Sequence, residues 1–95
     1  MKSTSSKTSD ASVIALKFMG FIASDESRME RFTALSGIYP DDLRNNAGEP
    51  TFQGFVLDYA LQDEALILEF AASEGLSPEK IAAARYDLPG ATYDF

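Results

Sequence analysis

Two segments of this chain align without gaps and contain the same helix boundary signals. Residues 25–43 (DESRMERFTALSGIYPDDL) and residues 63–81 (DEALILEFAASEGLSPEKI) are related by an offset of 38 positions. Each begins with an acidic pair, and each carries a glycine followed by a proline three positions later. Acidic residues stabilise a helix start, glycine ends a helix in the left-handed conformation, and proline suits the first position of the next helix. The pattern therefore predicts a helix, a glycine corner and a second helix, used twice.

The same offset extends backward into the preceding segment. It places Phe32 on Phe70, and it places Phe18 and Phe21 on Val56 and Tyr59. A unit of this size that occurs twice usually means stacked units that share a core. We therefore expect two related three-helix halves, at about residues 10–48 and 49–90.

Six segments have helical periodicity together with start and stop signals. The first begins at Ser9 or Asp10 and ends near Ala23, and the last has Ser77 as its N-cap and Pro78 at its first position. No run alternates with period two and ends in a hairpin turn. The sequence predicts an all-α, compact bundle of five or six short helices, formed by a single domain at residues 10–90. Residues 1–9 are expected to be a disordered tail, and residues 91–95 a second tail.

Apolar residues exceed what one face of each helix needs. The first helix is apolar nearly all round, which is typical of a central helix or of one that meets a partner. In the fourth segment Phe52, Phe55, Val56 and Tyr59 form one face, and Leu57 and Leu61 lie off it. Leu68 lies off the inner face of the fifth segment. These leucines either complete the core or form an exposed apolar patch, and such patches mark partner sites.

The composition argues against several classes of function. The chain has no Cys and no His, and its formal net charge is −7. Thiol chemistry and a His-based catalytic triad are excluded, and a transition-metal site would lack its commonest ligand. The acidic pairs lie at helix starts, where capping explains them, and none has the spacing of a calcium loop. No glycine-rich phosphate loop is present. We therefore predict no enzyme activity, no catalytic residue, no cofactor and no metal.

The charge also bears on partners and location. A surface with a net charge of −7 repels phosphates and anionic membranes, so neither nucleic acid nor a membrane is an expected partner. The apolar segment 13–23 is interrupted by Lys17 and is too short to span a bilayer. We interpret it as a core helix and expect a cytoplasmic protein.

The leading hypothesis is a non-catalytic protein-interaction module that acts through an apolar helix face. Its candidate partner-binding residues are Leu57, Leu61 and Leu68, together with Arg28 and Arg31. The two arginines either grip an anionic partner or pair with surface acids. The expected partner is an unidentified protein or a second copy of the chain. The alternative is a nucleic-acid-binding helix–turn–helix regulator, which the glycine corners suggest and the net charge disfavours.

Three stretches carry a resemblance to a known family: ALKFMGFIASDE, RFTALSGIYPDDLR and VLDYALQDEALILEFAASEGLSP. Together they resemble a small family of uncharacterised helical bacterial proteins, a domain of unknown function, over about residues 12–90. The resemblance implies a helical domain in the bacterial cytoplasm. It implies no activity and assigns no functional residues.

Overall fold

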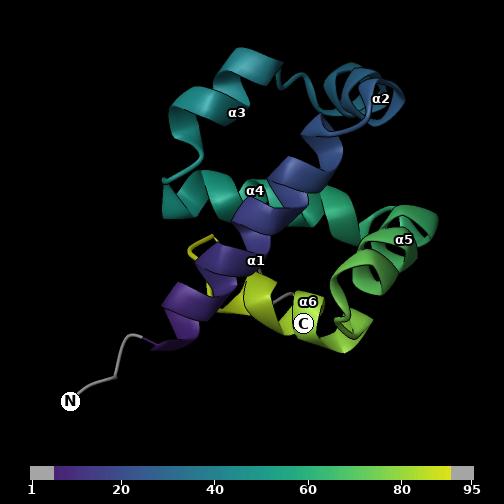
Figure 1. Cartoon of the computed structure of the whole chain (residues 1–95). Helices are drawn as coiled ribbons and strands as arrows, with labels where there is room; N and C mark the ends of the chain where they lie inside the picture. Colours follow the sequence, from purple (N-terminus) through teal and green to yellow (C-terminus); the bar gives the residue numbers. More distant parts are fainter. Residues whose placement is uncertain (1–5, 91–95) are drawn as a thin grey trace.

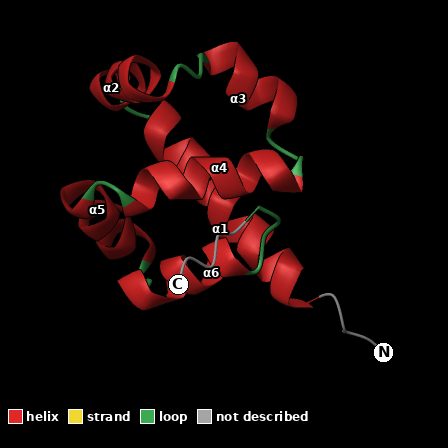
Figure 2. Ribbon diagram, turned by 180° about the vertical axis from the view of Figure 1, so that it is seen from behind, coloured by secondary structure: helices red, strands yellow, loops and turns green. Residues whose placement is uncertain are grey.

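The computed structural model describes residues 6–90, which form six helices joined by short loops (Figure 1). Their bounds are α1 Ser6–Ala23, α2 Glu26–Ser36, α3 Pro40–Asn46, α4 Pro50–Leu61, α5 Glu64–Glu74 and α6 Pro78–Tyr86. No strand occurs in this part of the chain, as Figure 2 also shows. The predicted all-α bundle is confirmed.

The two longest helices, α1 and α4, cross at the centre of the molecule (Figures 1 and 2). Helix α6 packs against both of them, α5 packs against α4 and α6, and α2 packs against the end of α1. The side chains of Phe18, Phe32 and Phe70 are fully buried between these helices. The core therefore surrounds the α1–α4 crossing, which explains why α1 is apolar on most of its circumference.

The helix boundaries follow the predicted capping residues. The Asp25 carboxylate accepts a hydrogen bond from the backbone N–H of Ser27, and the Asp63 carboxylate accepts one from the backbone N–H of Leu66. Gly37 and Gly75 end α2 and α5 with φ angles of 79° and 69°. Only glycine adopts this left-handed conformation without strain, so both glycine corners are confirmed.

Contacts between the halves also follow the repeat. Phe21 of α1 lies against Phe70 of α5, with ring centroids 5.4 Å apart. The residues at the equivalent positions, Tyr59 of α4 and Phe32 of α2, lie against each other at 4.6 Å. In each half, an aromatic residue of the first helix therefore contacts an aromatic residue on the second helix of the other half. The two contacts therefore join equivalent positions of the two halves, and the duplication itself stays a prediction.

The third helices of the two halves pack differently. Helix α6 contacts α1, α4 and α5, whereas α3 makes no comparably close backbone contact with any other described helix. The offset of 38 places Arg85 and Asp58, which form an ion pair between α6 and α4, on Ala47 and Gly20. The first half therefore lacks the side chains that hold its third helix onto its first.

The expected assignment of buried and exposed faces on α4 is wrong at Leu57. It is fully buried, at 0% exposure, whereas Phe55 of the expected inner face is half exposed. The reason is tertiary: α1 covers one side of α4 and α6 covers another, so the helix is buried on two sides. Leu57 belongs to the core, and its placement on a partner surface is wrong.

The first helix begins earlier than expected. Helix α1 starts at Ser6, so residues 6–9 are helical rather than part of a disordered tail. Ser, Thr and Lys cost at most about 0.7 kcal/mol per residue relative to Ala, and adding a turn to an existing helix needs no new nucleation. The predictions for residues 1–5 and 91–95 lie outside the described residues.

Candidate partner-binding groove

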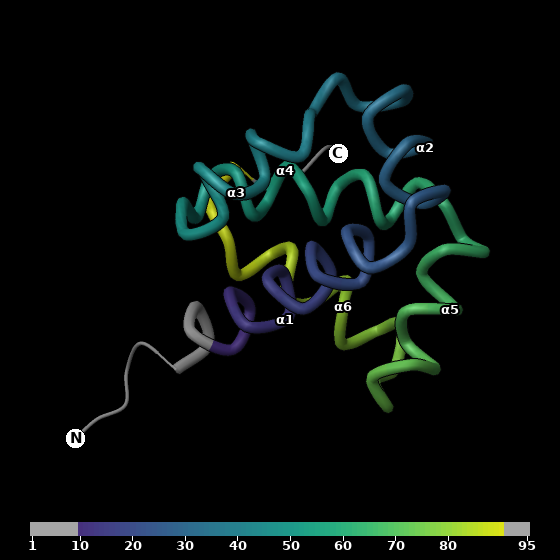
Figure 3. The backbone as a smooth tube through the Cα atoms, turned by 45° about the horizontal axis from the view of Figure 1, so that its top comes forward, coloured from purple at the N-terminus to yellow at the C-terminus, as the bar shows by residue number. Residues whose placement is uncertain are grey.

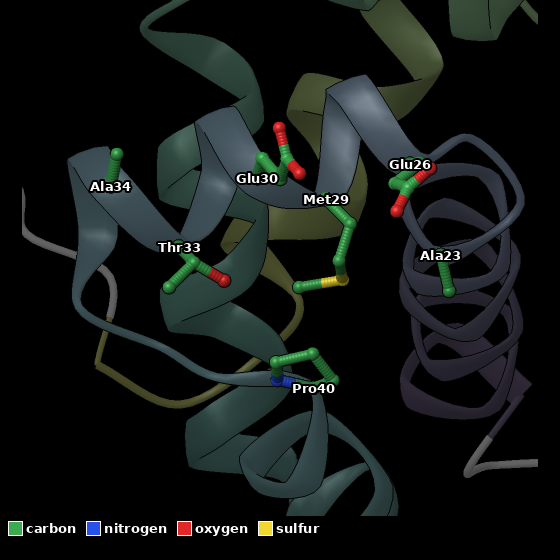
Figure 4. Close-up of a pocket in the computed structure, with 7 residues that line it drawn as sticks. All are labelled: Ala23, Glu26, Met29, Glu30, Thr33, Ala34 and Pro40. Carbon is green, nitrogen blue, oxygen red and sulfur yellow. The ribbon is translucent and has the colours of Figure 1, made fainter.

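An open apolar groove lies between α1, α2 and α3. Its walls are formed by Gly20 and Ala23 of α1, by Met29 of α2, and by Pro40 and Leu43 of α3. Two adjoining hollows of about 540 and 300 Å³, which share Ala23, Met29 and Pro40, make up what we call the α1–α2–α3 groove. Figure 4 shows the larger hollow, with Met29 pointing from α2 toward Pro40 and with Ala23 on the facing helix.

The groove exists because α3 does not close onto α1. In the second half the residues that correspond to Met19, Met29 and Leu43 are Leu57, Ile67 and Ile81, and all three are buried within the core. In the first half Met19 and Leu43 are also buried, but Met29 is only partly buried, and all three residues line the groove. The tube view in Figure 3 shows α2 and α3 apart from each other, near different parts of α1. The groove is thus the open counterpart of a closed helix junction.

The residues that line the groove are suited to contact an apolar ligand surface. Met19 and Met29 have flexible, polarisable side chains that adapt to irregular partners. Gly20 and Ala23 are small and exposed, and no atom lies within 4 Å of the position that a Cβ on Gly20 would take. A second backbone can therefore approach α1 closely at this point. Leu16, at 43% exposure, extends the apolar surface along α1 toward its N-terminus.

The rim of the groove is charged. Glu26 and Glu30 lie on successive turns of α2 and border the larger hollow (Figure 4). Arg44 borders the smaller hollow from α3, where its Nη1 donates to Oδ1 of Asp41 at 2.7 Å. Among the described side chains, neither glutamate forms an ion pair. The α2 rim is therefore acidic and the α3 rim is neutralised.

The leucines singled out from the sequence are not brought together by the groove. Leu61, at 39% exposure, lies at the end of α4, and Leu68, at 51%, lies on α5. Neither lines the α1–α2–α3 groove, and Leu57 is in the core. Two of the three are thus exposed, but they do not form part of this groove.

The two predicted arginines pair with acids of the same molecule. Arg28 stacks on the ring of Phe21, 3.9 Å from its centroid, and its Nη1 donates to the Phe21 carbonyl oxygen. It also lies within ion-pair distance of Asp25 and Glu69, at 3.7 and 3.8 Å. Arg31 pairs with Asp63 at 3.6 Å. Both arginines therefore connect α2 to the rest of the bundle.

A smaller hollow lies on the other side of α2, between Leu35 and Phe55. It has a volume of about 210 Å³ and includes the ring of Tyr59. Burial raises the pKa of Tyr59 above its usual value of 10.0, and the nearby Arg31 guanidinium opposes that rise. The hollow is smaller than either part of the α1–α2–α3 groove and has less apolar surface, so it is the weaker candidate for a helix.

The described side chains form no cluster that is suited to a metal ion. No group of three or more Asp or Glu residues there could hold a metal ion. Arg85, one of the two basic residues on the helix after the second glycine corner, is 6% exposed and paired with Asp58. It is therefore not available to a phosphate group.

Sequence reasoning missed the groove, although two signals pointed to it. The surplus of apolar residues on the first helix included Leu16, which extends the groove wall. The replacement of Arg85 and Asp58 by Ala47 and Gly20 across the repeat marks the third helix that does not close.

These features define a class of protein: a small all-helical domain with an open apolar groove. Its arginines form ion pairs with acidic residues of the same molecule. The chain belongs to the family described as protein of unknown function (DUF3572), whose model matches residues 8–91. The resemblance inferred from the sequence to a family of unknown function is confirmed. No curated protein and no solved structure matches the chain significantly. Within residues 6–90, no helix is both long enough and apolar enough to cross a bilayer.

Proposed function

We propose that this protein is a non-catalytic interaction module that binds the apolar face of a partner helix in the α1–α2–α3 groove. The observation that carries the proposal is the groove itself, an apolar hollow of about 540 Å³ that continues into a second of about 300 Å³. Amphipathic helices commonly bind proteins by laying an apolar face into such a groove.

The shape of the site favours a helix over a small enclosed ligand. The hollows are open along one side, and their walls come from three helices. The small residues Gly20 and Ala23 permit close backbone approach, and Met29 can adjust to the side chains that enter.

The helix–turn–helix alternative has less support. A DNA-reading helix needs exposed basic or amide side chains. Arg85 of α6 is buried and Arg44 of α3 is paired with Asp41, which leaves Lys80 as the exposed basic side chain of these two helices. The net charge of the chain is −7. We also propose that the module acts in the bacterial cytoplasm. The family resemblance supports this location, and the absence of cysteine in the chain agrees with it.

The test uses an amphipathic model peptide and a matched pair of variants. Backbone amide chemical shifts of the labelled protein are followed while a helical peptide with a leucine face is added. We expect shifts to concentrate around Gly20, Ala23 and Met29. Leu16→Glu at the groove wall should abolish binding, whereas Leu68→Glu, at a similarly exposed leucine outside the groove, should not.

The outcome that contradicts the proposal is equally definite. If the peptide shifts residues of α5 and α6 instead, or if Leu68→Glu weakens binding as much as Leu16→Glu, the groove is not the site. Circular dichroism of both variants shows that they remain folded, which both exposed positions should allow.

A further inference from the structure

The charges of α2 are divided between its two sides. Arg28 faces α1 and α5, where it stacks on Phe21 and pairs with Glu69, and Arg31 pairs with Asp63. Glu26 and Glu30, by contrast, border the groove. The basic residues of this helix thus form ion pairs within the molecule, while Glu26 and Glu30 border the groove and can contact a ligand that binds there.

The two glutamates are suited to act together. They are four residues apart in one helix, so their side chains lie one above the other on the same face. Both are exposed, and neither forms an ion pair among the described side chains. Arg44, the basic residue that lines the groove, is already paired with Asp41. The rim along α2 therefore has an uncompensated charge beside an apolar floor.

We infer that the partner of the α1–α2–α3 groove is a basic amphipathic helix. Its apolar face lies on Gly20, Ala23 and Met29, and Lys or Arg residues one turn apart flank that face and pair with Glu26 and Glu30. The inference rests on the proposed function, because it specifies the chemistry of the helix that the groove takes. A second copy of this chain fits less well, since it would bring another charge of −7 to an acidic rim.

The experiment compares three peptides that share one leucine face and differ only in the residues that flank it. The flanks carry Lys, Gln or Glu. Each peptide is titrated by fluorescence anisotropy into the wild-type protein, into Glu26→Gln/Glu30→Gln, and into Glu64→Gln/Glu79→Gln. The last variant is the matched control, because it removes two exposed acids that do not line the groove. Like Glu26, Glu79 lies in the first turn of its helix.

We expect the Lys peptide to bind the wild type most tightly and the Glu peptide most weakly. Neutralising Glu26 and Glu30 should weaken the Lys peptide roughly threefold to tenfold, the range for two exposed ion pairs. The control variant should bind the Lys peptide within about twofold of the wild type, because distant exposed charges are screened. Raising the salt concentration should reduce the preference for Lys over Gln.

The possible negative results distinguish the failure of the basic partner from the failure of the proposed function. If the Lys and Gln peptides bind equally well, or if the control variant weakens binding as much as the groove variant, the basic partner is wrong while helix binding stands. If none of the three peptides binds, the proposed function fails as well. If the free protein self-associates with chemical shift changes around Gly20 and Ala23, the occupant is a second copy, and the basic partner is again overturned.

Discussion

Arg85 of α6 and Asp58 of α4 form a two-pronged ion pair, with Nε donating to Oδ1 at 2.6 Å and Nη2 donating to Oδ2 at 3.2 Å. The Nη1 atom of Arg85 also donates to the carbonyl oxygens of Leu88 and Pro89, at 3.4 and 3.1 Å. The guanidinium thus connects α6, α4 and the chain segment that follows α6. This pair holds α6 against α4 in the second half. The first half has no equivalent pair between α3 and α1, and the groove lies between those helices.

Removing the carboxylate should therefore cost more than removing a surface charge. Asp58→Asn leaves the charge of Arg85, which is 6% exposed, without its counter-ion. We expect a loss of about 1.5–3 kcal/mol in the free energy of unfolding, the range for hydrogen bonds to charged groups. Urea denaturation measures it. Arg44→Gln is the control, because it breaks an exposed pair with Asp41 and should cost less than about 1 kcal/mol. Equal losses in the two variants would contradict this account of Arg85.

Two helical glycines should respond to alanine in opposite ways. A Cβ on Gly54 would lie 2.7 Å from Nη1 of Arg85 and 2.9 Å from the carbonyl oxygen of Pro89, so Gly54→Ala forces the ion pair and the backbone apart. We expect Gly54→Ala to destabilise the protein by about 1–3 kcal/mol. A Cβ on Gly20 meets no atom within 4 Å, and Gly20→Ala should stabilise the protein by about 0.5–1 kcal/mol through helix propensity. Melting temperatures that move in the same direction would refute the contrast.

The leucines of α4 and α5 offer a similar contrast. Leu57 is fully buried, so Leu57→Ala should lower the free energy of unfolding by about 2–5 kcal/mol through lost burial and a new cavity. Leu68 is half exposed, and Leu68→Ala should change the same quantity by no more than about 0.5 kcal/mol. Denaturant unfolding of the two variants decides the matter. A costly Leu68→Ala would mean that α5 packs more tightly than the structure shows.

Tyr59 makes stability depend on pH at the alkaline end. Burial raises the pKa of Tyr59 above the 10.0 of the unfolded chain, so the folded state holds the proton when the unfolded state has lost it. Its contribution to stability is complete below that value and is lost as the pH rises through the raised pKa. Above about pH 10 the wild type should lose stability more steeply than Tyr59→Phe, which cannot ionise. Parallel stability curves for the two proteins would contradict the raised pKa.

Local signals predicted the elements of the fold, because the helices begin and end at residues that act on their own neighbours. Asp25, Asp63 and Ser77 cap helices through contacts within three positions, and Gly37 and Gly75 end helices through their own backbone angles. These interactions are local, so they can be read from the chain.

Burial on a second face could not be predicted in the same way. Leu57 is buried because α4 packs against α1, α5 and α6 at once, and that depends on how distant segments pack. The groove depends on a helix that fails to pack. The repeat carries one trace of it, since Arg85 and Asp58 correspond to Ala47 and Gly20.

The measurement that tests the central claim most directly is amide chemical shift mapping of the labelled protein, with a leucine-faced helical peptide as the probe. The account predicts that shifts concentrate at Gly20, Ala23 and Met29, and that Leu16→Glu removes them while Leu68→Glu leaves them in place. Shifts that map to α5 and α6, or that persist in Leu16→Glu, would show that the α1–α2–α3 groove is not the binding site.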